Sequence, residues 1–387
     1  MKRLLVLSLV LVVGISLLGV AAGKVGIVLD VGGRGDLSFN DMGFKGTDEA
    51  AEEFGLTMVE VQSASGNDYL PNFRNLARTG EYDLIIGVGY LLGDALGTVA
   101  AEYPDQKFAI IDVGWITGPN IVNYVYNENE ASALIGALNA MAALQHGYSA
   151  AGVVLGVPIS VLYHFEAGYR FGMDWGIAKY GEITGVTETV QMLYNYTGTF
   201  DDVALGKAAS EAMLAQGAVG VFNVAGPLGT GDHEAVVEFH ANAGTTLGAP
   251  YYFGVDANQD WFGLGQFALA SCLKRLDIGV YEAVKMVVEG NFTPGVNVGT
   301  VANGLMGISK FEHLGEFFDF VVKAGELEAD DWDTVVANWT ANRATLPDWI
   351  WDAIDELEAA ITDGSIVVPT ANSDDEINAI RAQYPLE

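Results

Sequence analysis

The sequence predicts an α/β protein of two lobes, each built on a doubly wound parallel sheet. Apolar, β-branched runs alternate with amphipathic helical stretches, which is typical of βαβ units. This series stops at a long helical stretch around Glu130–Gln145 and starts again at Ala151–Leu155. A chain of 387 residues, half of them hydrophobic, is long enough to form two cores.

The individual elements follow from the same periodicity. Predicted strands are Val25–Leu29, Thr57–Gln62, Leu84–Val88, Phe108–Asp112, Ile121–Tyr126, Ala151–Leu155, Ile183–Met192, Val219–Val224 and Tyr251–Val255. Predicted helices between them are Phe44–Phe54, Tyr69–Thr79, Asp94–Glu102, Phe165–Tyr180, Val203–Gln216 and Asp232–Ala243. The Trp-rich segment from Trp332 to Ile361 is interpreted as a C-terminal helix pair; stacking of these rings on a sugar is the alternative.

The chain is expected to pass between the lobes three times. The predicted passages are Gly147–Ala150, Gly254–Asp260 and Gly295–Gly304. They assign 24–147 plus 257–303 to the first lobe, 148–256 plus 304–370 to the second, and 371–387 to a C-terminal tail. Three passages make a three-strand hinge, which suits two lobes that close on a ligand.

The N-terminus has the pattern of an export signal. Lys2 and Arg3 precede an apolar run that ends in the small residues of 20–22, so 1–22 is predicted to be a signal peptide. The run could also remain uncleaved as an anchor. Because the only cysteine is Cys272, no cysteine is available for lipid attachment at the cleavage point. We expect a protein secreted to the periplasm or cell surface, either free or held by its uncleaved signal.

The charge balance narrows the possible partners. The formal net charge is −32, and loss of Lys2 and Arg3 with the signal would make it −34. A field of this sign repels nucleic acid and phosphorylated solutes. We therefore expect no nucleic-acid partner.

The common catalytic and cofactor motifs are incomplete. Gly87-Val88-Gly89 follows a predicted strand, but the third glycine, Gly93, comes one residue late for a dinucleotide site. The segment Asp256–Asp260 begins like a calcium loop but is not followed by the required glycine and glutamate. His233 and His240 could share a helix face, yet no third ligand has metal spacing. We expect no metal or cofactor; carboxylates paired for glycoside cleavage stay open, because their separation depends on the fold.

The loop after the first predicted strand is the best candidate for a ligand contact. Asp30 ends that strand, and Asp36, Ser38, Phe39 and Asn40 follow in a glycine-rich loop ahead of a helix. Ligands of open α/β sheets bind at the carboxyl ends of the strands. An aromatic ring among short polar side chains suits a flat, neutral, polar ligand. An ordinary βα turn with Phe39 packed inward is the alternative.

Several segments together resemble the basic membrane protein, or purine nucleoside receptor, family of ABC-transporter solute-binding proteins. They cover nearly the whole mature chain in order: Asp36–Asn40 with Gly43 and Gly46, His164–Gly172, Tyr196–Asp202, Gly220–Gly231, Gly254–Gln259, Ala270–Arg275 and Asp363–Pro369. The resemblance implies a type I periplasmic-binding fold and capture of a nucleoside, a purine nucleoside above all, for a membrane permease. It implies a monomer with no catalytic activity and no cofactor. The sequence departs from the family in lacking the lipid-attached cysteine and in having Pro227–Gly231 where Gly-Gly-Thr-Gly is typical. Its first acid pair is also spread over Gly32–Asp36, where Arg34 could adjust the choice of ligand.

The resemblance also implies roles for individual residues. Asp30 and Asp112 would accept hydrogen bonds from base N–H groups, and Phe39 and Phe222 would sandwich the base. Asp256 and Lys274 would form hydrogen bonds with the ribose hydroxyl groups. The full predicted ligand-binding set is Asp30, Ser38, Phe39, Asn40, Asp112, Phe222, Gly226, Asp256 and Lys274.

Three other functions stay open at this stage. A receptor for a sugar or another small polar solute would have the same fold. A nucleoside hydrolase could use the aspartates as catalytic groups. A sensory receptor could pass its ligand state to a membrane kinase.

Overall fold

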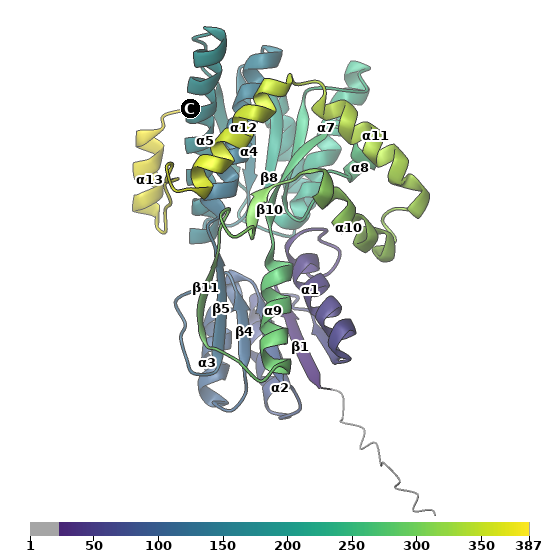
Figure 1. Ribbon diagram of the computed structural model, residues 1–387, viewed down its shortest axis with the longest axis vertical. Coiled ribbons are helices and arrows are strands. Elements are labelled where there is room, and N and C mark those ends of the chain that lie inside the picture. The colour runs from purple at the N-terminus through teal and green to yellow at the C-terminus, as the bar shows by residue number, and fades with distance from the viewer. Residues whose placement is uncertain (1–22, 387) are drawn as a thin grey trace, which may run out of the picture.

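The computed structural model describes residues 23–386, and the predicted signal segment lies outside them. The described chain forms two lobes stacked along the long axis of the molecule (Figure 1). Each lobe contains a six-stranded sheet, with strand orders β11-β5-β4-β3-β1-β2 and β12-β10-β9-β8-β6-β7. All pairings are parallel except that of β10 with β12. The predicted α/β class with two doubly wound sheets is confirmed.

The first lobe has helices on both faces of its sheet. Its strands are β1 (Lys24–Leu29), β2 (Thr57–Val61), β3 (Leu84–Val88), β4 (Phe108–Ile111), β5 (Ile121–Tyr126) and β11 (Gly295–Gly299). Its helices are α1 (Phe39–Phe54), α2 (Tyr69–Ala77), α3 (Gly93–Glu102) and α9 (Leu276–Val288). Side chains alternate along β1, so Ile27 packs on the face covered by α1 and α9 whereas Val28 packs with α2 and α3.

The second lobe carries more helices. Its strands are β6 (Ala150–Leu155), β7 (Gln191–Tyr196), β8 (Ala218–Val224), β9 (Tyr251–Asp256), β10 (Ala268–Lys274) and β12 (Met306–Ile308). Its helices are α4 (Glu128–His146), α5 (Ser160–Thr184), α6 (Val203–Ala215), α7 (Gly229–Ala243), α8 (Phe262–Gly265), α10 (Phe311–Ala324), α11 (Trp332–Arg343), α12 (Asp348–Thr362) and α13 (Asp374–Gln383). Helix α4 crosses the sheet face, and α5 and α12 pack on it (Figure 1). Within 23–386, no helix has the length and apolar content needed to span a membrane.

Two of the predicted lobe boundaries are wrong. Helix α4, placed within 24–147 of the first lobe, packs on α5 and on the second sheet. Strand β10, placed within 257–303 of the first lobe, pairs with β9 in the second sheet. The passages between lobes therefore lie next to Asn127, next to Arg275, and between β11 and β12. Glycine-rich turns suggested the wrong places because a turn does not reveal which sheet the next strand joins.

Two local predictions also differ from the structure. The predicted strand Ile183–Met192 is mostly the end of α5 and a loop, because α5 continues to Thr184 and ends at the left-handed Gly185 (φ 79°). The predicted tail of 371–387 contains α13, which buries Ile377 and Ile380 against the second lobe. Arg381 from this helix pairs with the Glu166 carboxylate at 2.8 Å, so the segment is part of the folded lobe.

Helices α4 and α5 approach each other through glycines on both partners. A Cβ atom at Gly168, Gly172 or Gly176 would lie 2.1, 2.0 or 2.7 Å from backbone atoms of α4. These glycines recur every four residues, so they form one face of α5 along which the two backbones touch. The contact fixes the helix layer that lies between the second sheet and the C-terminal helices.

Gly172→Ala should lower the free energy of unfolding by about 1–3 kcal/mol, because the added methyl group would collide with the Ala133 carbonyl of α4. Gly315→Ala in α10 is the matched control, since its Cβ would meet only a ring edge at 3.6 Å. That control should gain up to about 1 kcal/mol from helix propensity. Urea denaturation of both variants measures the difference; equal effects would contradict the backbone contact.

Candidate functional site

The candidate site is a cleft between the lobes, where the carboxyl ends of strands from both sheets face each other. It holds about 620 Å³ of space, part of it open to solvent. The first lobe contributes Asp30, Val31, Asp36, Phe39, Asn40, Gly89, Tyr90, Leu91 and Asp112 to the lining. The second contributes Ile159, Val161, Leu162, Phe165, Phe200, Val224, Ala225, Gly226, Pro227, Val255, Asp256 and Lys274. Seven of the nine predicted site residues are in this lining, all but Ser38 and Phe222.

The β1–α1 loop is shaped by the buried carboxylate of Asp36. It accepts hydrogen bonds from the backbone N–H groups of Ser38 (3.0 Å), Asn40 (2.7 Å) and Asp41 (3.0 Å). The Asn40 side-chain amide also donates to it at 3.0 Å. Burial raises the pKa of Asp36 to about 6, and the Asp41 charge adds to this. Asp36 therefore organises the loop that presents Phe39 to the cleft.

Asp30 and Asn40 are tied together within the first lobe. The Asn40 Oδ1 accepts a hydrogen bond from the backbone N–H of Asp30 at 3.0 Å. Both ends of the Asn40 side-chain amide therefore have hydrogen-bond partners within the protein. The Asp30 Oδ1 accepts from the Val31 N–H at 2.7 Å and from the Tyr69 hydroxyl. Burial raises the pKa of Asp30 to about 6. Asp30 is thus a fixed carboxylate on the wall of the cleft.

Lys274 and Asp112 join the two lobes at the floor of the cleft. The Lys274 Nζ donates to the Asp112 Oδ2 at 2.7 Å, and their side chains are only 1% and 5% exposed. The second Asp112 oxygen, Oδ1, is buried and has no hydrogen-bond partner among the described residues. Burial raises the pKa of Asp112 to about 6 even though Lys274 opposes the shift. A buried acceptor at the cleft wall is suited to an N–H or O–H donor of a ligand.

Asp256 faces this pair from the end of β9. The Ser38 hydroxyl donates to the Val255 carbonyl at 2.9 Å and lies 3.2 Å from the Asp256 Oδ2. Ser38 is therefore a link between lobes that supports Asp256 rather than a lining residue. Burial raises the pKa of Asp256 to about 7. Asp112 and Asp256 both have left-handed backbones, with φ of 66° and 62°, which few non-glycine residues adopt and which often mark functional sites.

The aromatic walls come from both lobes. Phe39 belongs to the first lobe, and Phe165 and Phe200 belong to the second. Phe39 lies near the ammonium of Lys274, whose Nζ is 5.3 Å from the ring centroid. Sequence reasoning missed Phe200 and Phe165 as lining residues. The segment containing Phe200 was recognised only as part of a motif, and nothing in the local sequence indicates that its ring reaches the cleft.

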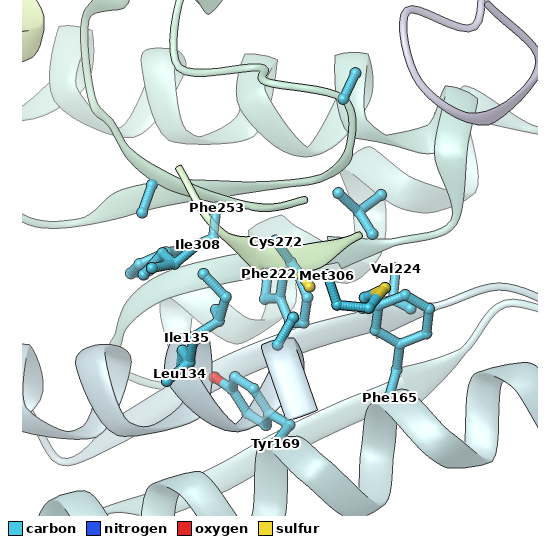
Figure 2. Packing of buried hydrophobic residues seen from close by; sticks show 14 of the residues in the cluster. Leu134, Ile135, Phe165, Tyr169, Phe222, Val224, Phe253, Cys272, Met306 and Ile308 are labelled. Carbon is cyan, nitrogen blue, oxygen red and sulfur yellow. The ribbon is translucent and has the colours of Figure 1, made fainter. Parts of the chain in front are cut away.

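The prediction for Phe222 is wrong. Phe222 is fully buried in the second lobe, where its ring stacks on Tyr169 at 5.7 Å and meets the edge of Phe165 at 6.3 Å. Figure 2 shows Phe222 inside the packed core, among the labelled hydrophobic side chains. Along β8, Val224 lies two residues closer to the strand end and does line the cleft. Phe222 shares its side of the strand but lies too deep to reach a ligand.

Gly226 follows β8 and lines the second-lobe wall. Its backbone has φ 54°, and its carbonyl accepts from the Asn223 side chain at 3.0 Å. A side chain is therefore disfavoured at this turn, which brings the backbone close to the cleft.

The arrangement can bind ligand groups that donate hydrogen bonds. Four buried carboxylates, Asp30, Asp36, Asp112 and Asp256, line the cleft together with one ammonium, Lys274. Within residues 23–386, no group of three histidine, cysteine or acidic side chains is placed to hold a metal ion. Cys272 is fully buried in β10 among hydrophobic residues. The cleft is thus suited to a ligand with several N–H or O–H groups and at least one flat face.

The raised pKa of Asp256 predicts a pH dependence of the ligand-free protein. The native state holds a proton on Asp256 up to about pH 7, whereas an ordinary aspartate releases it near 3.8. The native state therefore binds more protons within this window, and lowering the pH from 7 to 4 favours it. This contribution should amount to about 2–4 kcal/mol and be missing in Asp256→Asn. Urea denaturation of both proteins from pH 4 to 7 measures it; parallel profiles would contradict the assignment.

The known proteins that this chain resembles include substrate-binding proteins of ABC transporters. Residues 24–309 match the Bmp family, described as ABC transporter substrate-binding protein PnrA-like. An uncharacterised lipoprotein of Pyrococcus horikoshii is 36% identical over 92% of this chain and 86% of its own length. The ABC transporter nucleoside-binding protein BmpA of Lactococcus lactis is 28% identical over 78% of this chain and 85% of its own length.

Solved structures show the same architecture. The ABC transporter solute-binding protein of Aeropyrum pernix K1 is 34% identical, with a TM-score of 0.85 over 94% of this chain and 97% of that one. A solute-binding protein of Conexibacter woesei shares the fold with a TM-score of 0.60 at 19% identity, over 90% of this chain and 99% of that one. The fold is the type I fold of periplasmic solute-binding proteins. The chain belongs to the Bmp family of PnrA-like ABC transporter substrate-binding proteins.

Proposed function

We propose that this protein binds a purine nucleoside between its lobes and delivers it unchanged to an ABC permease. The observation that carries the proposal is the composition of the cleft. Aromatic side chains from both lobes line it together with four buried carboxylates and one lysine. A nucleoside combines a flat base with N–H donors and a sugar with hydroxyl donors, so it matches both parts of this lining.

The base would lie between the aromatic walls. Phe39 on one lobe and Phe200 or Phe165 on the other supply rings for the two faces, and offset stacking contributes about 0.5–1.5 kcal/mol beyond the buried area. Asp30 and Asp112 would accept hydrogen bonds from the edge of the base. The unpartnered Oδ1 of Asp112 supports this role, because an ionised carboxylate oxygen can only accept.

The ribose would lie against Asp256 and Lys274. When ionised, the Asp256 carboxylate can accept hydrogen bonds from two neighbouring hydroxyl groups, and the Lys274 ammonium can donate to their oxygens. Both side chains are buried, so these charge-assisted hydrogen bonds would be sheltered from water. The formal charge of the chain, −32, disfavours nucleotides, whose phosphates would be repelled.

Relatives support the cargo and the location. The Lactococcus lactis relative is named as a nucleoside-binding protein, and three Pyrococcus relatives are named as lipoproteins. We propose that this chain works outside the cytoplasmic membrane, delivered by its signal segment and retained by it if it is uncleaved. We also propose that it acts as a monomer and has no catalytic activity.

Mass spectrometry of ligand carried through mild purification, followed by calorimetry, tests the cargo. Purine nucleosides should bind, with sugars and nucleotides binding far more weakly. Heat from a sugar but not from any nucleoside would point to the sugar receptor instead. Release of free base during prolonged incubation would identify a nucleoside hydrolase.

Asp256→Ala should weaken nucleoside binding about ten- to hundredfold, because a hydrogen bond to a charged group contributes about 1.5–3 kcal/mol. Asp232→Ala is the matched control. Asp232 is also buried and has a pKa raised to about 7, but it bonds to Ser210 away from the cleft. Calorimetry should show the loss only in the Asp256 variant, and equal losses in both would indicate a general effect on folding.

Phe200→Ala should weaken binding about tenfold by removing one aromatic wall. Phe222→Leu should instead lower the midpoint of thermal unfolding and leave the dissociation constant within about twofold, because its ring packs in the core. Calorimetry and thermal denaturation of the two variants separate these effects. A Phe222 variant that folds normally and binds poorly would contradict the placement.

A further inference from the structure

A cluster of buried charged side chains, Asp112, Lys274, Glu128 and His164, extends from the cleft floor into the second lobe. We propose that Glu128 and His164, neither of which lines the cleft, are positioning residues that hold the Lys274 ammonium against Asp112 and the ligand. The proposal rests on the proposed function for the identity of the ligand. It assigns positioning roles to two side chains that only the tertiary structure brings together.

Lys274 is held by two carboxylates on different elements. Its Nζ lies 2.7 Å from the Asp112 Oδ2 and 2.9 Å from the Glu128 Oε1. The side chains of Lys274 and Glu128 are each 1% exposed. An ammonium has three N–H donors, so two can be directed to these carboxylates while the third serves a ligand. Glu128 therefore sets where the remaining donor points.

His164 is the member of this cluster that lies farthest from the cleft. Its Nδ1 lies 2.8 Å from the Glu128 Oε2, and its Nε2 lies 3.0 Å from the Asn372 Oδ1. The Asn372 amide nitrogen lies 3.4 Å from the Glu376 carboxylate, which keeps Oδ1 towards the imidazole. With an acceptor facing each ring nitrogen, the imidazole is suited to carry both protons. Burial alone lowers the pKa of His164, but the Glu128 hydrogen bond and charge outweigh it and raise the pKa overall.

Each charged group of this cluster faces a group of opposite charge, and Asp256 adds a further carboxylate near Lys274. Asp112 and Glu128 supply two negative charges, and Lys274 and a protonated His164 supply two positive charges. A buried charge is costly unless it is paired and hydrogen-bonded. Loss of Glu128 would remove one of the two anions that hold Lys274 and the anion that holds His164.

The cluster also lies where the chain passes between the lobes. Glu128 is the first residue of α4, directly after the first passage, and Lys274 is the last residue of β10, directly before the second. Asp112 follows β4 of the first lobe. The ion pair of Lys274 with Asp112 therefore bridges the lobes at the hinge side of the cleft, and Glu128 anchors the bridge to the second lobe.

The test is a double-mutant cycle on the full chain, with guanosine and adenosine as ligand probes in calorimetry. Glu128→Gln keeps the shape and removes the charge, and it should weaken binding about tenfold. In a Lys274→Met background the same change should have little further effect, because Glu128 acts through Lys274. Glu166→Gln is the matched control, since Glu166 is fully buried and paired with Arg170 and Arg381 away from the cleft lining. It should leave binding within about twofold.

An NMR titration of the His164 ring without ligand provides a second readout. Its pKa should fall in Glu128→Gln and stay unchanged in Glu166→Gln. Wild-type affinity in Glu128→Gln, an undiminished loss in the Lys274→Met background, or an unchanged His164 titration would overturn the proposal. If the wild-type protein binds neither probe, the nucleoside assignment fails, and the His164 titration alone decides whether the cluster exists.

Discussion

Charged groups from two lobes meet in one buried cleft, and the surrounding structure has to compensate the cost of keeping them there. Lys274, Asp112 and Asp256 have almost no contact with solvent. An unpaired charge in such a place would be costly, so the ammonium lies among carboxylates. Burial raises the pKa of Asp112 and that of Asp256. The left-handed backbones of Asp112 and Asp256 add local strain. A ligand that supplies N–H and O–H donors would satisfy acceptors such as the Asp112 Oδ1 that the protein leaves open.

The rest of each lobe provides the rigid support that this cleft requires. In the second lobe, α4 and α5 touch backbone to backbone through glycines, and α13 adds an ion pair to α5. In the first lobe, helices cover both faces of the parallel sheet. The polypeptide passes between the lobes next to Asn127, next to Arg275 and between β11 and β12. Movement concentrated there would open the cleft without disturbing either core.

Much of the fold could be predicted because the local periodicity of hydrophobic residues distinguishes strands from helices. Most of the runs predicted as strands and helices are the observed elements within a few residues, since an apolar run of strand length between amphipathic helices has few other solutions. The lobe boundaries could not be predicted in the same way. Strand β10 belongs to the second lobe because it pairs with β9. Helix α4 belongs to the same lobe because it packs against α5. Such contacts leave no signal in the residues at the boundary itself.

The sequence by itself determined the fold class, the family resemblance and the candidate loop at Asp30 to Asn40. The family resemblance also pointed to Asp112, Asp256 and Lys274, and all three line the cleft. The tertiary structure alone decided which ring faces the cleft, since Phe222 lies too deep along β8 whereas Phe200 reaches the opposite wall. It alone joined Glu128 and His164 to Lys274. The physical reason is that depth along a strand and contacts between distant segments depend on how the elements pack, which residue spacing does not record.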